Sequence, residues 1–279
     1  MSACIDAHQH FWIYDLKEFK WVDQSMAAIR RDFLPSHLEA QTSGVGVDGV
    51  ISVQARESLE ETRWLLKLAE ENHFIKGVVG WAPLTASDLR DELEPFLQSG
   101  KLRAVREICQ GQPPGFMLRP KFLSGVKVLG DLGLAYDILI KENQLQEAIQ
   151  FVDYFPNQVF ILDHLAKPGI RGCCIKPWAE KIVELSKREN VFCKVSGLVT
   201  EADWYTWTGD QLRPYFEIAL EAFGAKRIMF GSDWPVSLVA SDYGRWHATV
   251  EGYISSLSVS ECSDILGNTA VRAYRLGNG

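Results

Sequence analysis

Val159-Phe160-Ile161-Leu162-Asp163-His164 is the stretch that decides the fold, because four consecutive apolar residues run directly into an acid and a histidine. A short apolar run without alternation is typical of a parallel strand that is buried on both faces. In α/β barrels, functional side chains lie at the carboxyl ends of such strands. The stretch therefore predicts one barrel strand that carries a polar pair to the rim.

Similar β-rich runs recur along the whole chain and alternate with longer helical patterns. The other predicted strands cover residues 4–8, 49–54, 75–81, 102–108, 135–140, 191–196 and 227–231. Apolar residues at helical spacing predict helices over 58–71, 86–98, 144–155, 178–189, 211–223 and 243–256. The pair Ser258 and Glu261 has capping-box spacing and opens a last helix toward Tyr274. This order predicts an α/β fold, a single (β/α)8 TIM barrel over residues 1–279. A doubly wound open sheet is disfavoured because no Gly-rich phosphate turn follows the first strand.

Composition narrows the class of function. The net charge of the 279 residues is −7, and no long run carries one sign, which argues against nucleic-acid and anionic-membrane partners. No apolar run approaches the ~18 residues of a membrane helix, and Met1-Ser2-Ala3 does not open an export signal. The six cysteines form no CxxC pair, so we expect buried, reduced thiols. A cytoplasmic enzyme is the expectation.

Two histidines end the first predicted strand. Residues i and i+2 of a strand share a face, so His8 and His10 should project from one side of its end. They would supply two of the three protein ligands of a catalytic metal site. Taken alone, the pair fits equally a polar strand end or core imidazoles bonded to carbonyls.

The other strand ends supply candidate partners. His8, His10 and His164 with Asp233 would hold one divalent ion, with zinc favoured and manganese or iron as alternatives. Taken alone, Asp233 reads as the N-cap of a following turn; three histidines at other strand ends favour a rim carboxylate. Further polar residues at the rim are Arg106, Glu107, Asp163 and Lys194. Glu107 is a candidate ligand or substrate contact, but Arg106 precedes it on the opposite face, so only one can point inward. Arg106 and Glu107 also fit structural ion pairs with a nearby helix, and Asp163 and Lys194 fit a buried pair that simply neutralises itself.

Four motifs in order carry a resemblance to a known family. They are Ile5-Asp6-Ala7-His8-Gln9-His10-Phe11-Trp12, Leu162-Asp163-His164-Leu165-Ala166-Lys167-Pro168, Lys194-Val195-Ser196-Gly197-Leu198 and Gly231-Ser232-Asp233-Trp234-Pro235. Together with Leu266-Gly267-Asn268-Thr269-Ala270 they resemble the amidohydrolase-related sugar-lactonase group of the amidohydrolase superfamily, which includes fuconolactonases and rhamnonolactonases. The resemblance spans almost the whole chain.

The resemblance implies a distorted barrel, a mononuclear metal centre or its remnant, and hydrolysis of lactones. The substrates it implies are L-fucono-, L-rhamnono- or L-galactonolactone, with dicarboxylate lactones of the pyrone or muconate type as an alternative. By the motif match, His8, His10, His164 and Asp233 are site residues. Activity without a metal stays open, because some members of the group need none. Arg106 and Glu107 stand where binuclear members of the superfamily carry a carbamylated lysine, which argues for one ion.

We therefore expect water to attack the lactone carbonyl, with Asp233 as general base and His164 as its catalytic partner. Without a metal, the histidines with Arg106 or Lys194 would supply the positive field. Substrate contacts are predicted for Trp12 and Trp234 by stacking and for polar residues by hydrogen bonding; these are Gln54, Arg56, Arg106, Glu107 and Lys194. Trp81 is a further stacking candidate. The long loop over residues 11–35 is either a wall of the site or an aromatic-packed surface excursion.

Rival functions use the same residues. An amidase or phosphoesterase would need the same ligands, a decarboxylase of the same superfamily would release CO2, and a sugar-binding barrel would tolerate loss of Asp233. The expected partner is a small-molecule lactone, and assembly into a homo-oligomer is left open.

Overall fold

Eight parallel strands form one continuous sheet in chain order. The computed structural model describes residues 3–277, so the two residues at each end of the predicted 1–279 domain lie outside the described range. Each strand pairs in parallel with the next, from β1 through β8. The strands are β1 (Ile5–Gln9), β2 (Gly49–Val53), β3 (Ile75–Gly80), β4 (Leu102–Ile108), β5 (Ala135–Leu139), β6 (Phe160–Leu162), β7 (Val191–Val195) and β8 (Ile228–Phe230). The predicted barrel is confirmed.

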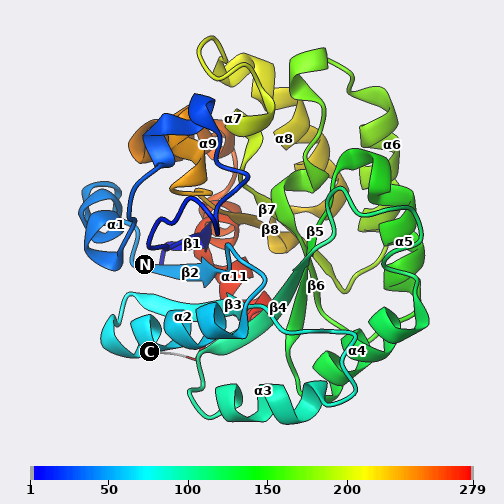
Figure 1. The fold of residues 1–279 in the computed structure, drawn as a ribbon. Coiled ribbons are helices and arrows are strands. Elements are labelled where there is room, and N and C mark those ends of the chain that lie inside the picture. Colours follow the sequence, from blue (N-terminus) through cyan, green and yellow to red (C-terminus); the bar gives the residue numbers. More distant parts are fainter. Residues whose placement is uncertain (1–2, 278–279) are drawn as a thin grey trace.

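Helices surround this sheet and connect its strands (Figure 1). The predicted helices are α2 (Leu59–Glu71), α3 (Leu89–Leu97), α5 (Leu145–Asp153), α6 (Lys176–Ser186), α8 (Gly209–Phe223) and α9 (Tyr243–Ile254). The last helical stretch is divided into α10 (Val259–Ser263), a π-helical turn (Asp264–Asn268) and α11 (Thr269–Ala273). Its predicted capping box is present, because the Glu261 amide donates to Ser258 Oγ and the Ser258 amide donates to Glu261 Oε2.

Three helices were not predicted from the sequence. They are α1 (Pro35–Thr42), the single turn α7 (Leu198–Glu201) and α4 (Pro120–Asp131). The helical pattern of α4 is weakened by Gly125 and Gly130, since glycine costs about 1 kcal/mol relative to alanine inside a helix. The glycine at 125 is required by packing. A Cβ there would lie 2.0 Å from the carbonyl oxygen of Leu84, so α4 approaches the chain after β3 more closely than any side chain allows.

The junction between β8 and β1 differs from the seven other strand pairs. It is the place where the barrel is distorted, as the family resemblance implied. Within residues 3–277 no ladder joins these two strands; the chain just beyond β8 bonds to the end of β1 instead. The Asp233 amide donates to the His8 carbonyl at 2.8 Å, and the His10 amide donates to the Trp234 carbonyl at 2.7 Å. The buried Asp6 carboxylate adds a side-chain link by accepting from the Ser232 amide at 2.9 Å. This seam places Asp233 beside the two histidines.

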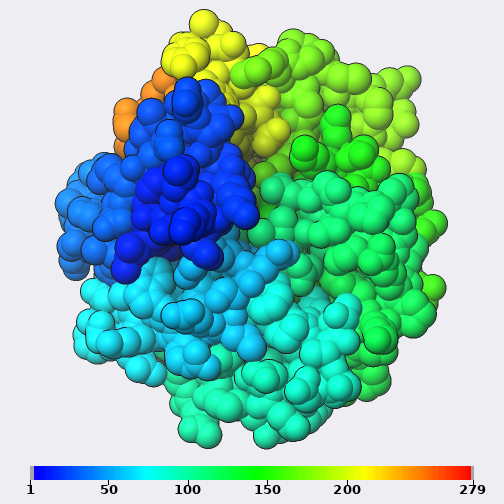
Figure 2. Space-filling model, in the orientation of Figure 1, coloured from blue at the N-terminus to red at the C-terminus, as the bar shows by residue number. Residues whose placement is uncertain are grey.

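The segment after β1 lies over the mouth of the barrel and packs through aromatic rings. Trp12 is almost fully buried, and its ring lies 5.3 Å from Phe19 and 5.5 Å from Phe33. Figure 2 shows the N-terminal region, in blue, forming part of this face of the molecule. The aromatic packing fits both predicted alternatives, but Trp12 and Trp21 of this loop also line the cavity at the strand ends, so the loop is a wall of that cavity.

The cysteine prediction is half right. All six thiols are free, but only Cys109 and Cys193 are buried, whereas Cys173 and Cys174 are exposed. These two lie in a short turn between β6 and α6, at the surface of the molecule. Across residues 3–277, no helix has the length and apolarity that crossing a membrane requires.

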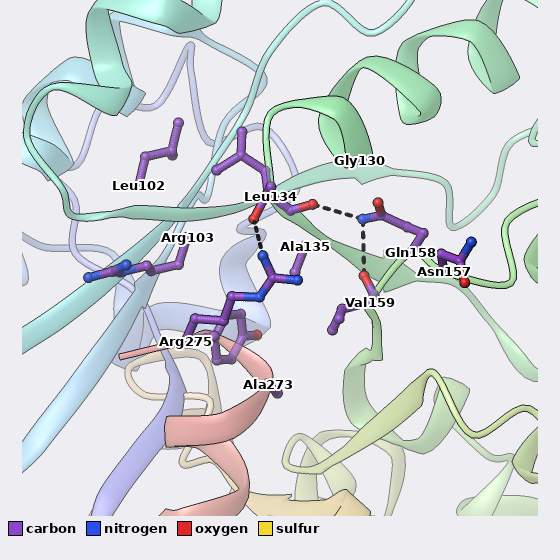
Figure 3. Close-up of a pocket in the computed structure, with 12 residues that line it drawn as sticks. Leu102, Arg103, Gly130, Leu134, Ala135, Asn157, Gln158, Val159, Ala273 and Arg275 are labelled. Atoms are coloured by element: carbon purple, nitrogen blue, oxygen red, sulfur yellow. Dashed lines mark hydrogen bonds between the residues drawn. The ribbon is translucent and has the colours of Figure 1, made fainter. Parts of the chain in front are cut away.

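A small cavity of about 70 Å³ lies at the other end of the barrel, near the start of β4 and β5 (Figure 3). Two of its polar side chains bond to backbone carbonyls. Gln158 Nε2 donates to Leu134 at 2.8 Å and to Val159 at 3.1 Å, and Arg275 donates to Gly133. These bonds are structural contacts at the N-terminal end of the barrel. The predicted functional residues lie at the opposite end.

Two helical glycines give a test of this packing. We expect Gly125→Ala to lower the free energy of unfolding by about 1–3 kcal/mol or more, because the new methyl collides with backbone. Gly252→Ala in α9 should raise it by about 0.5–1 kcal/mol, because nothing lies within 4 Å of the added Cβ. Chemical denaturation of both variants measures the two shifts, and equal signs would contradict the proposed packing of α4.

Candidate active site

Three imidazoles and one carboxylate converge at the C-terminal end of the barrel. Nε2 of His8 lies 3.2 Å from Nε2 of His10. Oδ1 of Asp233 lies 3.8 Å and 3.6 Å from these two atoms, and 4.0 Å from Nε2 of His164. All four residues are at most 5 % exposed. The side chains that the sequence predicted as one set are thus brought together by β1, β6 and β8.

The first strand is irregular where it delivers its histidines. Asp6 pairs with Val50, but Gln9 pairs with Ser52, so the register shifts between these two points and His8 lies inside the irregular stretch. Bulges of this kind re-aim side chains and are frequent next to active sites. The shift explains how His8 meets side chains of β4, β6 and β7 while His10 reaches the cavity.

Each imidazole is held by its Nδ1 edge. His10 Nδ1 lies 2.8 Å from the Val53 carbonyl, which can only accept, so the proton is on Nδ1 and Nε2 carries a free lone pair. His164 Nδ1 bonds to Ser196 Oγ at 2.9 Å. His8 Nδ1 lies 3.3 Å from Asp163 Oδ1 and 3.1 Å from Lys194 Nζ. The three Nε2 atoms are therefore aimed at a common point by groups behind them.

The donor set fits a divalent ion. Two ligands at about 2.0–2.1 Å from a tetrahedral zinc are separated by roughly 3.3 Å, close to the observed 3.2 Å between His8 and His10. Candidate ligand atoms form two overlapping groups, His8 with His10 and Asp233, and His8 with Asp163 and His164. Imidazoles oriented by hydrogen bonds on their far edges are the usual support of metal ligands.

Protonation states agree with this geometry. Burial lowers the pKa of His164 to about 4, and burial also lowers the pKa of His8 and His10, so all three imidazoles are neutral near pH 7. Burial alone would raise the pKa of Asp233, but His164 and His10 outweigh it and lower the pKa. Neutral imidazoles beside an ionised carboxylate are what a metal or a water-activating site requires.

A buried ion network supports the cluster from within the barrel. Oδ2 of Asp163 accepts a hydrogen bond from Arg106 at 2.9 Å, and Oδ1 forms an ion pair with Lys194 Nζ at 2.9 Å. Lys194 Nζ donates to Asp137 at 2.6 Å. Lys194 and Arg106, with His8, hold the pKa of Asp163 well below its usual range despite burial. Because two cations face two carboxylates, the network places fixed charges under His8 with little net charge.

A cavity of about 240 Å³ opens above these groups. The predicted residues His10, His164, Asp233, Arg106 and Trp12 line it. So do residues to which the sequence analysis gave no role there, namely Trp21, Ala55, Ile108, Gln110, Leu139, Lys167, Thr200 and Val236. Lys167 lies in one of the family motifs and Trp21 in the long loop, so the sequence offered a signal for both. The others lie at or after strand ends and belong to no motif that would have identified them.

Comparison with known proteins places this arrangement in a family. The sequence profile described as amidohydrolase matches residues 5–276. The chain belongs to the amidohydrolase family. It is 36% identical to L-fucono-1,5-lactonase of Burkholderia multivorans, over 98% of this chain and 96% of that protein. It is 23% identical to L-rhamnono-gamma-lactonase of Scheffersomyces stipitis, over 74% of this chain and 70% of that protein.

A solved structure agrees in detail with the fold of this amidohydrolase. The crystal structure of an amidohydrolase from Burkholderia multivorans with bound zinc superposes with a TM-score of 0.96. The two chains are 35% identical, and the alignment covers 99% of this chain and 100% of that one. The whole barrel, including the strand ends that carry the cluster, is therefore shared with a protein that holds zinc.

The remaining predicted contact residues do not line the cavity. Gln54 and Lys194 are fully buried beneath it, and Gln54 Nε2 donates to the Arg106 carbonyl at 3.2 Å. Trp234 packs edge-on against Phe33, with ring centroids 5.0 Å apart. Arg56 lines a neighbouring cavity of about 170 Å³ with Trp12. These positions support the walls rather than face the space inside.

Glu107 lies apart from the cluster. On β4, Arg106 points into the barrel, as the alternation of strand side chains requires, and Glu107 points away. Trp81 Nε1 donates to Glu107 Oε2 at 3.1 Å. Burial, with a contribution from Glu57, raises the pKa of Glu107 to about 8, so the carboxyl group is protonated near pH 7 and is a weak candidate ligand.

Gly197 fixes the approach of two cluster residues. It has a φ of +65°, and a Cβ there would lie 2.6 Å from His164 Nδ1 and 3.1 Å from Asp233 Oδ2. We expect Gly197→Ala to displace the His164 ring and to weaken zinc binding by roughly 10–100-fold. Gly224→Ala, at a φ of +70° with open space around it, is the matched control that carries backbone strain alone. Competition with a chromophoric chelator measures both; equal affinities would contradict this role.

Acid should destabilise the metal-free protein through the cluster. The folded-state pKa of His164 is about 4, against about 6.5 in an unfolded chain. As the pH falls from 6.5 to 4, the unfolded state binds a proton that the folded state does not, so stability is lost, by up to roughly 3 kcal/mol. Denaturation of chelator-treated protein across this range should show a shallower pH dependence for His164→Gln. An unchanged slope would mean that His164 is already charged in the fold.

Proposed function

We propose that this amidohydrolase opens the ester ring of a small sugar-acid lactone, with L-fucono-, L-rhamnono- and L-galactonolactone as the favoured substrates. The observation that carries the proposal is the convergence of three neutral imidazoles on Oδ1 of Asp233. His10, His164 and Asp233 line one cavity of about 240 Å³, and His8 is fully buried beside them. The similarity to a protein named L-fucono-1,5-lactonase over nearly its whole length supports the substrate class.

The cavity suits a neutral, ring-sized molecule. Ligand pockets run from roughly 300 to 1,000 Å³, so a space of 240 Å³ fits a monosaccharide-sized ring better than a larger ligand. Trp12 and Trp21 offer ring edges or faces for sugar CH groups, and Gln110 and Thr200 offer hydrogen bonds to hydroxyls.

An acidic substrate would need convergent cations, and the cavity offers few. Arg106 lines the cavity, but its terminal nitrogens already bond to Asp163 and to the Gln54 carbonyl, so its charge is paired within the protein. Among the described residues that line the space, Lys167 is the other cation. A pyrone or muconate dicarboxylate would leave at least one carboxylate without a counter-charge, which favours the polyhydroxy lactone.

A metal is assigned by the donor set. We assign one divalent ion to His8, His10, His164 and Asp233, zinc first and manganese second; when bound, it would polarise the lactone carbonyl and lower the pKa of a water molecule. Glu107 does not belong to this set. Support comes from the Nε2 geometry, the neutral imidazoles and the relative with bound zinc.

The chain's own groups carry the proton. The Asp233 carboxylate takes a proton from the attacking water as its oxygen bonds to the carbonyl carbon, and returns that proton to the ring oxygen as the ring C–O bond breaks. His164, held by Ser196, faces Asp233 and keeps it ionised. Arg106 beneath the cluster provides a fixed positive charge on the side where the oxyanion develops.

The test combines one variant with one panel. Asp233→Asn should reduce lactone hydrolysis by about 10²–10⁴-fold while the fold is retained, because the general base is lost. Asp242→Asn, at the N-cap of α9 where asparagine caps equally well, is the matched control. A pH-indicator assay on fucono-, rhamnono-, galactono- and pyrone-dicarboxylate lactones, with chelated, zinc-loaded and manganese-loaded protein, reports the substrate class and the metal requirement.

Several outcomes would overturn the proposal. Full activity of Asp233→Asn would show that Asp233 is not the general base. Wild-type protein that hydrolyses amides or releases CO2 but opens no lactone would show that the reaction is a different one. Undiminished lactone hydrolysis after chelation would support the lactonase activity but contradict the proposed metal requirement.

A further inference from the structure

The chain between β6 and α6 adopts a backbone conformation that side chains rarely permit. His164, Leu165, Ala166 and Lys167 have φ values of 54°, 51°, 61° and 50°, four consecutive non-glycine residues in the left-handed region. Each such residue brings its Cβ too close to the following carbonyl oxygen, a steric cost that L-residues rarely accept. Strain of this kind persists only where the surroundings hold it, and it is concentrated at functional sites.

Core contacts hold the middle of this turn. Leu165 and Ala166 are fully buried, and Trp178 Nε1 on α6 donates to the Leu165 carbonyl at 2.7 Å. The turn is closed by the Lys167 amide, which donates to the His164 carbonyl at 2.8 Å. Side chains three residues apart in such a turn eclipse each other. The left-handed turn therefore presents His164 and Lys167 on one side, and both line the cavity.

The Lys167 ammonium has no polar partner among the described residues. Within residues 3–277 no hydrogen bond or ion pair reaches its Nζ, although it is only partly exposed. Arg106, the other cation of the cavity, is engaged by Asp163 and Gln54. Lys167 and Asp233 line the same cavity of about 240 Å³, so the ammonium and this carboxylate face one small space. Burial lowers the pKa of Lys167, and the nearby carboxylates Glu201, Asp233 and Asp163 act against this effect.

The position of Lys167 suits an interaction with the ring oxygen of the lactone, which is the leaving group of the reaction. The carbonyl oxygen of a bound lactone belongs beside the histidine cluster and Arg106, at the floor. The ring oxygen must come within reach of Asp233, which returns the proton to it. Lys167 is the lining cation that has N–H groups to offer there.

We propose that Lys167 is a catalytic residue whose Nζ–H donates a hydrogen bond to the lactone ring oxygen and stabilises the negative charge that forms as the ring C–O bond breaks. The inference rests on the proposed lactonase function. The electron pair of that bond moves to the ring oxygen, Asp233 supplies the proton taken from water, and Lys167 keeps its own proton. The product is one hydroxy acid, and the ammonium is released unchanged.

The experiment is chemical rescue. With L-fucono-1,5-lactone as the probe, Lys167→Ala should lower kcat by about 10²-fold and change KM little, because the interaction forms in the transition state. Added ethylammonium should restore a large part of kcat, since it supplies N–H donors and charge. Tetramethylammonium, which has charge without N–H groups, should restore nothing. Lys167→Arg should retain more activity than Lys167→Met.

Controls separate this inference from folding and from the function itself. Lys121→Ala, exposed on α4, should keep wild-type kcat and show no response to ethylammonium. Thermal melts and zinc titration of Lys167→Ala should match wild type, which excludes collapse of the turn. A kcat within about threefold of wild type, a loss confined to KM, or a loss that ethylammonium cannot restore would overturn the role of Lys167. Wild-type protein that opens no lactone would instead overturn the proposed function.

Discussion

The site depends on one constraint, that each imidazole of the cluster is fixed through its Nδ1 edge so that its Nε2 edge faces Oδ1 of Asp233. The Val53 carbonyl does this for His10, Ser196 for His164, and the pair of Asp163 and Lys194 for His8. A histidine without such a partner would rotate or exchange tautomers, and the distances to Asp233 would not be maintained. The groups behind the cluster are thus as necessary as the cluster.

Burial makes this constraint effective and also costly. The imidazoles stay neutral because they are desolvated, while Asp233 stays ionised because imidazoles and Lys167 surround it. The charges needed beneath them are supplied in opposed pairs by Arg106, Asp163, Lys194 and Asp137. Removing one partner of such a pair would leave an uncompensated buried charge, which is far more destabilising than losing the pair as a whole.

Backbone geometry completes the site where side-chain packing cannot. Gly197 leaves room for His164 and Asp233, and the left-handed turn from His164 to Lys167 brings two cavity residues to one side. Asp233 itself has a φ of 57°. The barrel supplies the stable frame that holds these unfavourable conformations, because the surrounding core residues are close-packed and leave the chain no alternative path.

The sequence by itself determined the eight strands, the rim that carries function and the set of His8, His10, His164 and Asp233, because apolar runs and the polar residues after them are local signals. It also required that Arg106 and Glu107 point opposite ways. Only the tertiary structure decided which points inward, that Trp234, Gln54 and Lys194 lie behind the cavity, and that Lys167 lies within it. Those outcomes depend on the seam between β8 and β1, the register shift in β1 and a left-handed turn. None of these leaves a periodic trace in the sequence, since each arises from contacts between residues far apart along the chain.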